Sequence, residues 1–128
     1  MCICEGGVAY AWGDSYKGQL GTLPIGTDWS HSNTQINTVP EPLVLPENTF
    51  VEKVVCGGIH SALLTTDGSL YTWGCGSDGR IGHPEYEGYV YLYKESRPKR
   101  VEAFSQGGGS ARVVDVASAY YHMACLVA

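Results

Sequence analysis

Apolar and polar residues alternate along several short stretches of this chain, with turn-forming residues between them. Val51 to Cys56 alternates and is rich in β-branched side chains, and Ser61 to Thr65 and Leu70 to Gly74 follow as two further short apolar stretches. Short runs of this kind are typical of β-strands that are buried on at least one face. The pattern therefore predicts three consecutive strands over these ranges.

Turn signals connect the three predicted strands and lead into a fourth. A tight Gly57-Gly58 passage separates the first two, and Asp67-Gly68 separates the second from the third. Asp and Gly tolerate the positive φ of a two-residue primed turn, so we expect a hairpin at Asp67-Gly68. We also expect an outer edge strand near Lys99 to Ala103, because Pro98 at its start costs no ladder hydrogen bond. The result is a unit of four antiparallel strands.

The same pattern occurs twice along the chain. GVAYAWG at residues 7–13 returns as GSLYTWG at 68–74, and GQLG at 18–21 returns at the same offset as GRIG at 79–82. A third phrase, VxxVxxGxxHxxxL from Val51, returns as VxxVxxAxxHxxxL from Val113. Repetition at a fixed period indicates a repeat architecture, and it argues against a search for one active site.

A four-stranded antiparallel unit of about 60 residues, with apolar residues on both faces, fits one blade of a β-propeller. A parallel β-helix or a leucine-rich solenoid would require a period of roughly half this length or less. Trp12 and Trp73 stand at the same place in their third strands, and we expect both to be buried between adjacent blades. Gly13 and Gly74, which follow them, let the next backbone pass closely.

These predictions define the domain organisation. Residues 1–128 form one partial β-propeller domain, in which repeat one covers about 7–67, repeat two covers about 68–128, and residues 1–5 are a strand of the preceding unit. Each unit covers its apolar faces only with its neighbours, and three or more units are usually needed for a stable core. We therefore expect the remaining blades to come from the same chain or from other chains.

In these motifs the chain resembles the regulator of chromosome condensation repeat family. The shared features are aromatic-x-Trp-Gly, Gly-x-Leu-Gly, an outer strand led by proline, and Val-x-x-Val-x-x-Gly-x-x-His. The resemblance implies an all-β, typically seven-bladed β-propeller in which the sequence repeat is offset from the blade. Val51 to Ala103 would then be a complete blade, Met1 to about Leu45 the outer three strands of the preceding blade, and Val113 to Val127 the inner two strands of the following one.

Composition and charge narrow the range of partners. Seventeen glycines and six prolines among short apolar runs suit an all-β protein. A net charge of −5 argues against direct binding of nucleic acid or an anionic membrane, since both need clustered Lys and Arg. Apolar runs stay shorter than a membrane span, and the first residues lack the pattern of a signal peptide. We expect a reducing intracellular compartment, the cytoplasm or nucleus first, with an organelle lumen as the open alternative.

The cysteines and histidines are interpreted as structural residues. The five cysteines form neither a paired framework nor zinc-ligand spacings, so we expect small buried apolar side chains, no metal and no cofactor. His60 and His122 recur once per repeat, which favours a hydrogen bond to a loop or neighbouring strand over catalysis. Ser61 follows His60, but side chains adjacent on a strand point to opposite faces, which excludes a relay between them. No catalytic residue is therefore assigned, and the segment is predicted not to be an enzyme.

A tyrosine-rich insert precedes the outer strand of the second repeat. Tyr89, Tyr91 and Tyr93 alternate with aliphatic residues, so an extended segment would present one tyrosine face. Tyrosine is favoured at protein interfaces because it buries much area and keeps a polar tip. We expect these three residues to bind a protein partner, with Arg97 or Lys99 at the rim. The alternative, that the insert packs on its own blade, stays open.

The resemblance implies three classes of function. The first is a non-catalytic scaffold for protein–protein interaction, whose partner is a small GTPase or a larger complex. The second is part of a guanine nucleotide exchange factor for a Ran-like small GTPase, although no exchange residue carries over to this chain. The third, ultraviolet sensing, would need a Gly-Trp-Arg-His-Thr phrase where this chain has the sequence GGIHS at residues 57–61.

Overall fold

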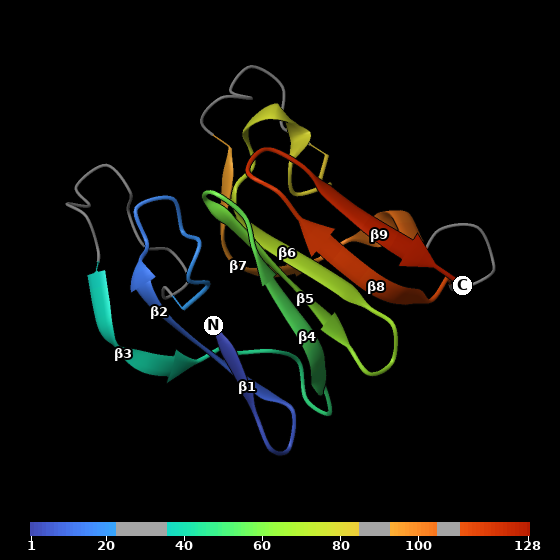
Figure 1. The fold of residues 1–128 in the computed structure, drawn as a ribbon, viewed down its shortest axis with the longest axis horizontal. Helices are drawn as coiled ribbons and strands as arrows, with labels where there is room; N and C mark the ends of the chain where they lie inside the picture. Colours follow the sequence, from blue (N-terminus) through green and yellow to red (C-terminus); the bar gives the residue numbers. More distant parts are fainter. Residues whose placement is uncertain (23–35, 85–92, 105–110) are drawn as a thin grey trace.

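The chain folds into short antiparallel strands grouped in three sheets (Figure 1). The computed structural model describes residues 1–22, 36–84, 93–104 and 111–128. In these residues the strands are β1 Cys2–Cys4, β2 Val8–Asp14, β3 Ile36–Pro42, β4 Val51–Cys56, β5 His60–Thr65, β6 Leu70–Cys75, β7 Lys94–Arg100, β8 Val113–Ser118 and β9 Met123–Val127. Two short 3-10 turns, η2 at Ser77–Gly79 and η4 at Glu102–Phe104, are the only helical elements described.

The sheets follow the chain in order. Strands β1, β2 and β3 form the first sheet, β4 to β7 the second, and β8 and β9 the third. Figure 1 shows them side by side, with the blue and cyan first sheet and the red third sheet on either side of the green second one. The all-β fold is confirmed, as are the complete four-stranded unit in the predicted range and the partial units that flank it.

Two apolar cores hold the three sheets together. Alternation along β5 separates them: Leu63 points toward the first sheet, whereas Ala62 and Leu64 point toward the third. The core between the first and second sheets contains Ala9, Ala11, Leu20, Leu43, Val51, Leu63 and Trp73. The core between the second and third contains Ala62, Leu64, Leu70, Val101, Val113 and Val116. Strand β5 is thus buried on both faces, and this is why its apolar residues form a continuous run.

The hairpin between β5 and β6 has a longer turn than the sequence predicts. Four residues, 66–69, connect the strands, and Gly68 has a positive φ of 86° whereas Asp67 does not. The Asp67 carboxylate accepts hydrogen bonds from the Thr65 hydroxyl and, at 3.1 Å, from the Ser69 backbone N–H. The hydrogen bond from Thr65 is the main reason why the pKa of Asp67 lies below its usual value. The predicted two-residue primed turn is wrong because Asp67 caps the turn with its side chain instead.

The outer strand begins earlier than predicted, at Lys94 rather than near Lys99, and it contains Pro98. The register between β6 and β7 shifts between Thr72 and Gly74, so Pro98 falls in a bulge without a ladder partner. The first sheet shows the same irregularity around Pro40, between the pairs that β2 makes with β3. A bulge leaves one strand locally unpaired, which is why proline is tolerated inside both outer strands.

Candidate protein-interaction surface

Trp73 on β6 locks the second sheet to the first. Its side chain is fully buried, and its Nε1–H donates a hydrogen bond of 2.9 Å to the backbone carbonyl of Gln19. The Ser61 hydroxyl donates to the same carbonyl at 2.7 Å. A Cβ atom at Gly21 would lie 2.6 Å from the Trp73 Nε1 atom, so the glycine makes room for the indole. The prediction that Trp73 is buried between repeat units is confirmed.

Gly74 allows the close backbone passage that the sequence predicts. A Cβ atom there would lie 2.8 Å from both the His60 Cα atom and the Ile59 carbonyl oxygen. The same Ile59 carbonyl accepts a 2.9 Å hydrogen bond from the Cys75 backbone N–H. Any side chain at this position would push β6 away from β5 at the end of the sheet that carries the loops.

The equivalent residues of the first sheet behave differently. Trp12 is 42% exposed rather than buried, and a Cβ atom at Gly13 would meet nothing within 4 Å. Burial of Trp12 and a close backbone passage at Gly13 between two adjacent blades therefore stay predictions. Trp12 points away from the second sheet, as Trp73 points away from the third, and no sheet of the described residues lies against that face.

His60 joins the second sheet to the third. The buried ring places Nε2 3.0 Å from the Ser118 hydroxyl oxygen, as expected for a structural histidine. Burial is the main reason why the pKa of His60 lies below its usual value, and the positive charge of Arg80 lowers it further. His122 is exposed, however, so the equivalent role is not seen there.

The turn before each histidine is the same in both copies despite the bulkier second sequence. The Gly57 backbone N–H donates to the His60 carbonyl at 2.8 Å, and the Ala119 N–H donates to the His122 carbonyl at the same distance. A Cβ atom at Gly57 would collide with the buried His60 ring, 2.2 Å from its Cε1 atom. Because the His122 ring is exposed, Ala119 is tolerated in the second copy.

Aromatic and basic side chains gather at one end of the three sheets. Strand β5 starts at the end where β6 finishes, so the turns 57–59 and 119–122 lie at the same end as the loops 15–21 and 76–84. We call this surface the loop-end face. Contacts across it join the second and third sheets: the Arg80 guanidinium carbon lies 5.0 Å from the centre of the Tyr121 ring, and Tyr120 packs over Gly58.

Three tyrosines of the loop-end face are unusually exposed for large aromatic residues. Tyr120 and Tyr121 are 60% and 62% exposed, with ring centres 4.7 Å apart in an edge-to-face arrangement. Tyr16 is 51% exposed, and the Lys17 ammonium lies 5.0 Å above its ring. This surface was not predicted from the sequence. The available signal was Tyr120-Tyr121 in the second copy where the first has Gly58-Ile59.

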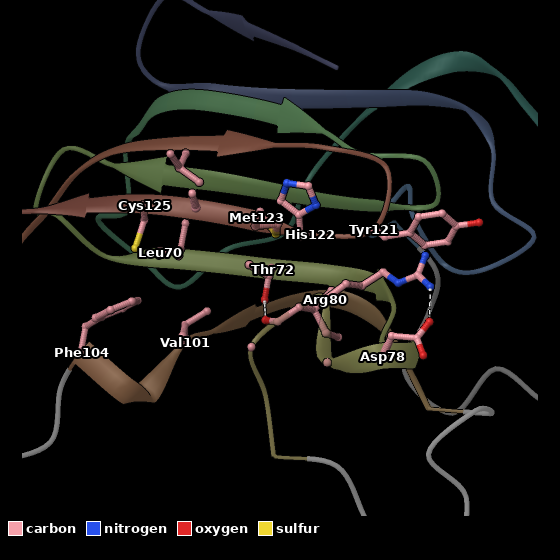
Figure 2. A pocket seen from close by; sticks show the side chains of 15 residues that line it. Leu70, Thr72, Asp78, Arg80, Val101, Phe104, Tyr121, His122, Met123 and Cys125 are labelled. Carbon is pink, nitrogen blue, oxygen red and sulfur yellow. Dashed lines mark hydrogen bonds and ion pairs between the residues drawn. The ribbon is translucent and has the colours of Figure 1, made fainter.

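The guanidinium of Arg80 lies against the ring of Tyr121 and is itself held in place by the loop around it. Its side chain is only 4% exposed, its Nε–H donates to the Ser77 carbonyl at 2.8 Å, and its Nη2 lies 3.2 Å from Asp78. Figure 2 shows the guanidinium between Tyr121 and Asp78. A cation held rigidly against an aromatic face fixes the ring in place, so Tyr121 is presented to solvent in a defined orientation.

The predicted tyrosine site is described only in part. Tyr89 and Tyr91 lie outside the described residues. The Tyr93 hydroxyl donates to the Glu95 carboxylate at 2.6 Å, and Lys99 lies 3.2 Å from the same carboxylate. The Tyr93 ring lies against Gly76, whose backbone N–H donates to the Tyr93 carbonyl at 2.9 Å.

These contacts fasten the end of the insert to the blade and bring Tyr93 and Lys99 together. Arg97 lies on β7, between them in sequence. Tyr93 thus packs against the loop that also carries Arg80, at the base of the loop-end face.

The cysteines and the remaining histidines give no metal site in the described residues. Cys75 is buried, but Cys2, Cys4 and Cys56 are exposed, contrary to the prediction. His83 is buried, with Nε2 2.8 Å from the Thr72 hydroxyl, whereas His31 lies outside the described residues. No group of three or more potential ligands is close enough to hold a metal ion there, and no described helix could cross a membrane.

A cleft of about 250 Å³ opens between the second and third sheets (Figure 2). Leu70, Thr72 and Val101 form the wall on the second sheet, and Met123 and Cys125 form the wall on β9. Arg80 and Tyr121 close it at the loop-end face. Burial in this wall raises the pKa of the Cys125 thiol.

Comparison with protein families gives two matches to one repeat. The Regulator of chromosome condensation (RCC1) repeat matches residues 6–64 and again residues 67–126. A second model of the same repeat matches residues 51–80.

Comparison with individual proteins gives relatives that are much longer than this chain. Human E3 ubiquitin-protein ligase HERC2 is 36% identical over 91% of the chain, which spans 2% of that protein. Human WBSCR16 has a crystal structure similar to this one, with a TM-score of 0.67 and 27% identity, covering 98% of this chain and 28% of that one. Prp20p from Saccharomyces cerevisiae has a TM-score of 0.74 at 20% identity, covering 97% and 28%, which shows likeness of fold alone.

Proposed function

The chain belongs to the regulator of chromosome condensation repeat family, and we propose that it acts as a non-catalytic scaffold for protein–protein interaction. The loop-end face carries this proposal. It presents Tyr120 and Tyr121 on a tight turn between two strands, next to a buried arginine. Tyrosine and arginine are enriched among the residues that contribute most to binding energy in protein interfaces. Loops mounted on a rigid repeat scaffold are the usual place for recognition.

The tyrosine-rich insert adds a second contact region to the same proposal. Tyr89, Tyr91 and Tyr93 are proposed to contact the partner, with Arg97 or Lys99 at the rim. The anchoring of Tyr93 on Gly76 supports this, because it fixes the end of the insert beside the loop that carries Arg80. A partner that contacts Tyr121 would then be within reach of the insert.

The experiment identifies the partner by proximity and then measures its affinity. A photo-crosslinking amino acid replaces Tyr121 in cells, and the crosslinked protein is identified, purified and titrated against the chain. We expect the double variant Tyr120→Ala, Tyr121→Ala to weaken binding roughly thirtyfold or more, as for truncation of a central interface residue. Tyr91→Ala tests the insert in the same titration.

Phe50→Ala is the matched control, since Phe50 is a half-exposed aromatic residue outside the loop-end face. It should leave the affinity unchanged. Equal affinities for the wild-type chain and the double tyrosine variant, with both proteins folded, would disprove the proposal.

A part in nucleotide exchange on a Ran-like small GTPase is the second candidate. Yeast Prp20p, which has the same fold, is described with binding properties toward Gsp1p and histones. The discriminating measurement is the release of a fluorescent guanine nucleotide from a Ran-like GTPase in the presence of this chain. Accelerated release would favour exchange, and binding without acceleration would favour the scaffold.

The proposed cellular context follows from the same observations. The ligase activity of HERC2 is not transferred to this chain, which matches 2% of that protein.

The remaining blades of the propeller are proposed to come from the same or other chains, and the partner to be a small GTPase or a larger complex. Five free cysteines, three of them exposed, favour a reducing intracellular compartment.

A further inference from the structure

His83 is a buried histidine that the second sheet has and the first sheet lacks. Its side chain is 6% exposed, and its Nε2 atom lies 2.8 Å from the Thr72 hydroxyl oxygen and 3.3 Å from the Thr72 carbonyl oxygen. At the offset that relates the GQLG and GRIG phrases, the first copy has Thr22 and Ala11 at these positions. The first sheet therefore forms its strands without this pair, so the histidine is not a requirement of the repeat fold.

The Thr72 hydroxyl fixes the tautomer of His83. This hydroxyl donates its only proton to the Ile81 carbonyl oxygen, so toward the imidazole it can act only as an acceptor. The Nε2 atom of the neutral ring must then carry the hydrogen, which it donates to the hydroxyl and carbonyl oxygens of Thr72. The neutral Nε2–H tautomer is thus the form that matches this site.

An ion pair lies on the same face of the second sheet as the imidazole. Thr72 pairs with Lys99 across the ladder between β6 and β7. Gly74, two residues further along β6, pairs with Glu95. Directly opposed residues share a face, as do residues two apart on one strand, so Lys99 and Glu95 lie on the face that carries the Thr72 side chain. Lys99 lies 3.2 Å from the Glu95 carboxylate, which also accepts a 2.6 Å hydrogen bond from the Tyr93 hydroxyl.

The groups around His83 act on its protonation in opposite directions. Burial is the main reason why the pKa of His83 lies below its usual value, and the positive charge of Lys99 on β7 lowers it further. The hydrogen bond with the Thr72 backbone and the carboxylates of Glu95 on β7 and Glu102 on η4 act the other way and raise it. A protonated ring therefore fits the buried position poorly, whereas direct contact with a carboxylate would stabilise its charge.

We propose that His83 is a proton-operated switch on the second sheet. The neutral ring is bound to Thr72, and the protonated ring moves to the Glu95 carboxylate, where it displaces the Tyr93 hydroxyl. This exchange replaces the hydrogen bond from an uncharged hydroxyl with one between two charged groups, which is the stronger kind.

The direction of the switch follows from proton linkage. Bound to Thr72, His83 has a pKa below that of an ordinary histidine, about 6.5, so the released ring binds the proton more tightly. A falling pH therefore shifts the population from the Thr72 position to the Glu95 position, by at most about tenfold per pH unit for one proton. The ring stays on Thr72 at neutral pH and leaves it as the pH falls below about 6.5.

Tyr93 connects the switch to the surface. Its ring lies against Gly76, whose backbone N–H donates to the Tyr93 carbonyl at 2.9 Å, so it packs beside the loop that carries Arg80. Tyr93 and Lys99 are also among the residues proposed above to contact a partner. Control of partner binding by pH therefore rests on the proposed function, whereas the movement of the imidazole does not.

Nuclear magnetic resonance of the chain with labelled histidine and tyrosine rings follows both ends of the switch. At neutral pH the imidazole nitrogen shifts of His83 should show the Nε2–H tautomer. Between pH of about 7.5 and about 5, the ring signals of His83 and Tyr93 should change with one common midpoint. The two signals are assigned with His83→Gln and Tyr93→Phe.

Two variants separate the parts of the switch. His83→Gln keeps an N–H donor for Thr72 and removes the titration, so the Tyr93 signal should become independent of pH. Glu95→Gln removes the charged acceptor, so the Tyr93 signal should no longer follow the His83 titration. His60→Gln is the matched control, because it removes another buried histidine and should leave the Tyr93 midpoint unchanged.

Four results would overturn the proposal. They are a Tyr93 signal that is independent of pH in the folded wild type, a Tyr93 titration that persists in His83→Gln, an Nδ1–H tautomer of His83 at neutral pH, and loss of all folded signals in one step at the shared midpoint. If His83→Gln fails to fold, a Tyr93 titration that persists in Glu95→Gln overturns it instead, since the Glu95 side chain is 23% exposed and easier to replace. All readouts use the chain without a partner, so they are independent of the crosslinking experiment on the proposed function.

Discussion

The indole N–H of Trp73, in the second sheet, donates a 2.9 Å hydrogen bond to the backbone carbonyl of Gln19, in the loop that follows the first sheet's central strand. This bond joins residues 54 positions apart, and the Ser61 hydroxyl donates to the same carbonyl. Two donors from the second sheet thus bind one carbonyl of the loop that follows β2 in the first sheet. The contact fixes the position of the second sheet on the first, and with it the loop-end face.

Truncation of Trp73 should therefore be among the most damaging single changes. Trp73→Ala removes a fully buried aromatic side chain and should lower the free energy of unfolding by about 3–5 kcal/mol. Urea denaturation at a fixed protein concentration measures the effect. Trp12→Ala, at the exposed equivalent, should cost much less in the monomer. A Trp73→Ala variant within about 1 kcal/mol of the wild type would contradict the lock between the sheets.

Alanine substitutions at two glycines distinguish the cost of backbone strain from the cost of steric collision. Gly74 and Gly13 have positive φ values of 100° and 115°, but only Gly74 lies against a neighbouring backbone. Gly13→Ala should cost about 1–2 kcal/mol from the left-handed conformation alone. Gly74→Ala should cost a further 1–3 kcal/mol or so, since the His60 Cα atom cannot move aside easily. Thermal denaturation of both variants gives the comparison, and equal losses would refute the close passage.

The His60–Ser118 pair should couple the second and third sheets. The His60 Nδ1 atom is buried without a partner in the described residues, so Ser118→Ala would leave the whole ring unsatisfied. We expect a loss of about 1–3 kcal/mol. A double-mutant cycle with His60→Ala should give a coupling energy of at least about 0.5 kcal/mol. Strict additivity of the two single changes would mean that the pair does not connect the sheets.

Stability should fall in mild acid because of two buried histidines. Burial holds the pKa values of His60 and His83 below their usual value in the folded chain. The unfolded chain therefore binds more protons, so stability is retained above pH of about 6.5 and is lost as the pH falls through the lower folded values. Urea titrations between pH 7.5 and about 5 measure the slope, which His60→Gln and His83→Gln should each reduce. A pH-independent midpoint in the wild type would contradict this prediction.

The sequence was sufficient for the fold because the repeat carries the information twice. Strands β4, β5 and β6 follow directly from alternation and turn residues, and the offset between copies placed Trp73 in the core. The position of Pro98 could not be predicted, because the bulge that accommodates it depends on the register between β6 and β7.

The residues at the edges of the repeat array were predicted less well. Burial of Trp12, His122, Cys2 and Cys4 depends on a neighbouring sheet, whereas the sequence pattern describes only the position within a unit. The loop-end face was missed for a related reason. The contact of Arg80 with Tyr121 joins the second and third sheets, and a motif within one strand or turn does not contain it.

Hydrogen exchange of the tryptophan indole N–H groups, followed by nuclear magnetic resonance, tests the interlocked repeats most directly. The three indole signals are assigned with the variants Trp12→Phe, Trp29→Phe and Trp73→Phe. We expect the Trp73 indole to exchange as slowly as the core amides of β5, because it is buried and bonded to Gln19. The Trp12 indole should exchange fast in dilute protein. Fast exchange of the Trp73 indole in the folded protein would contradict its burial and hydrogen bond between the first and second sheets.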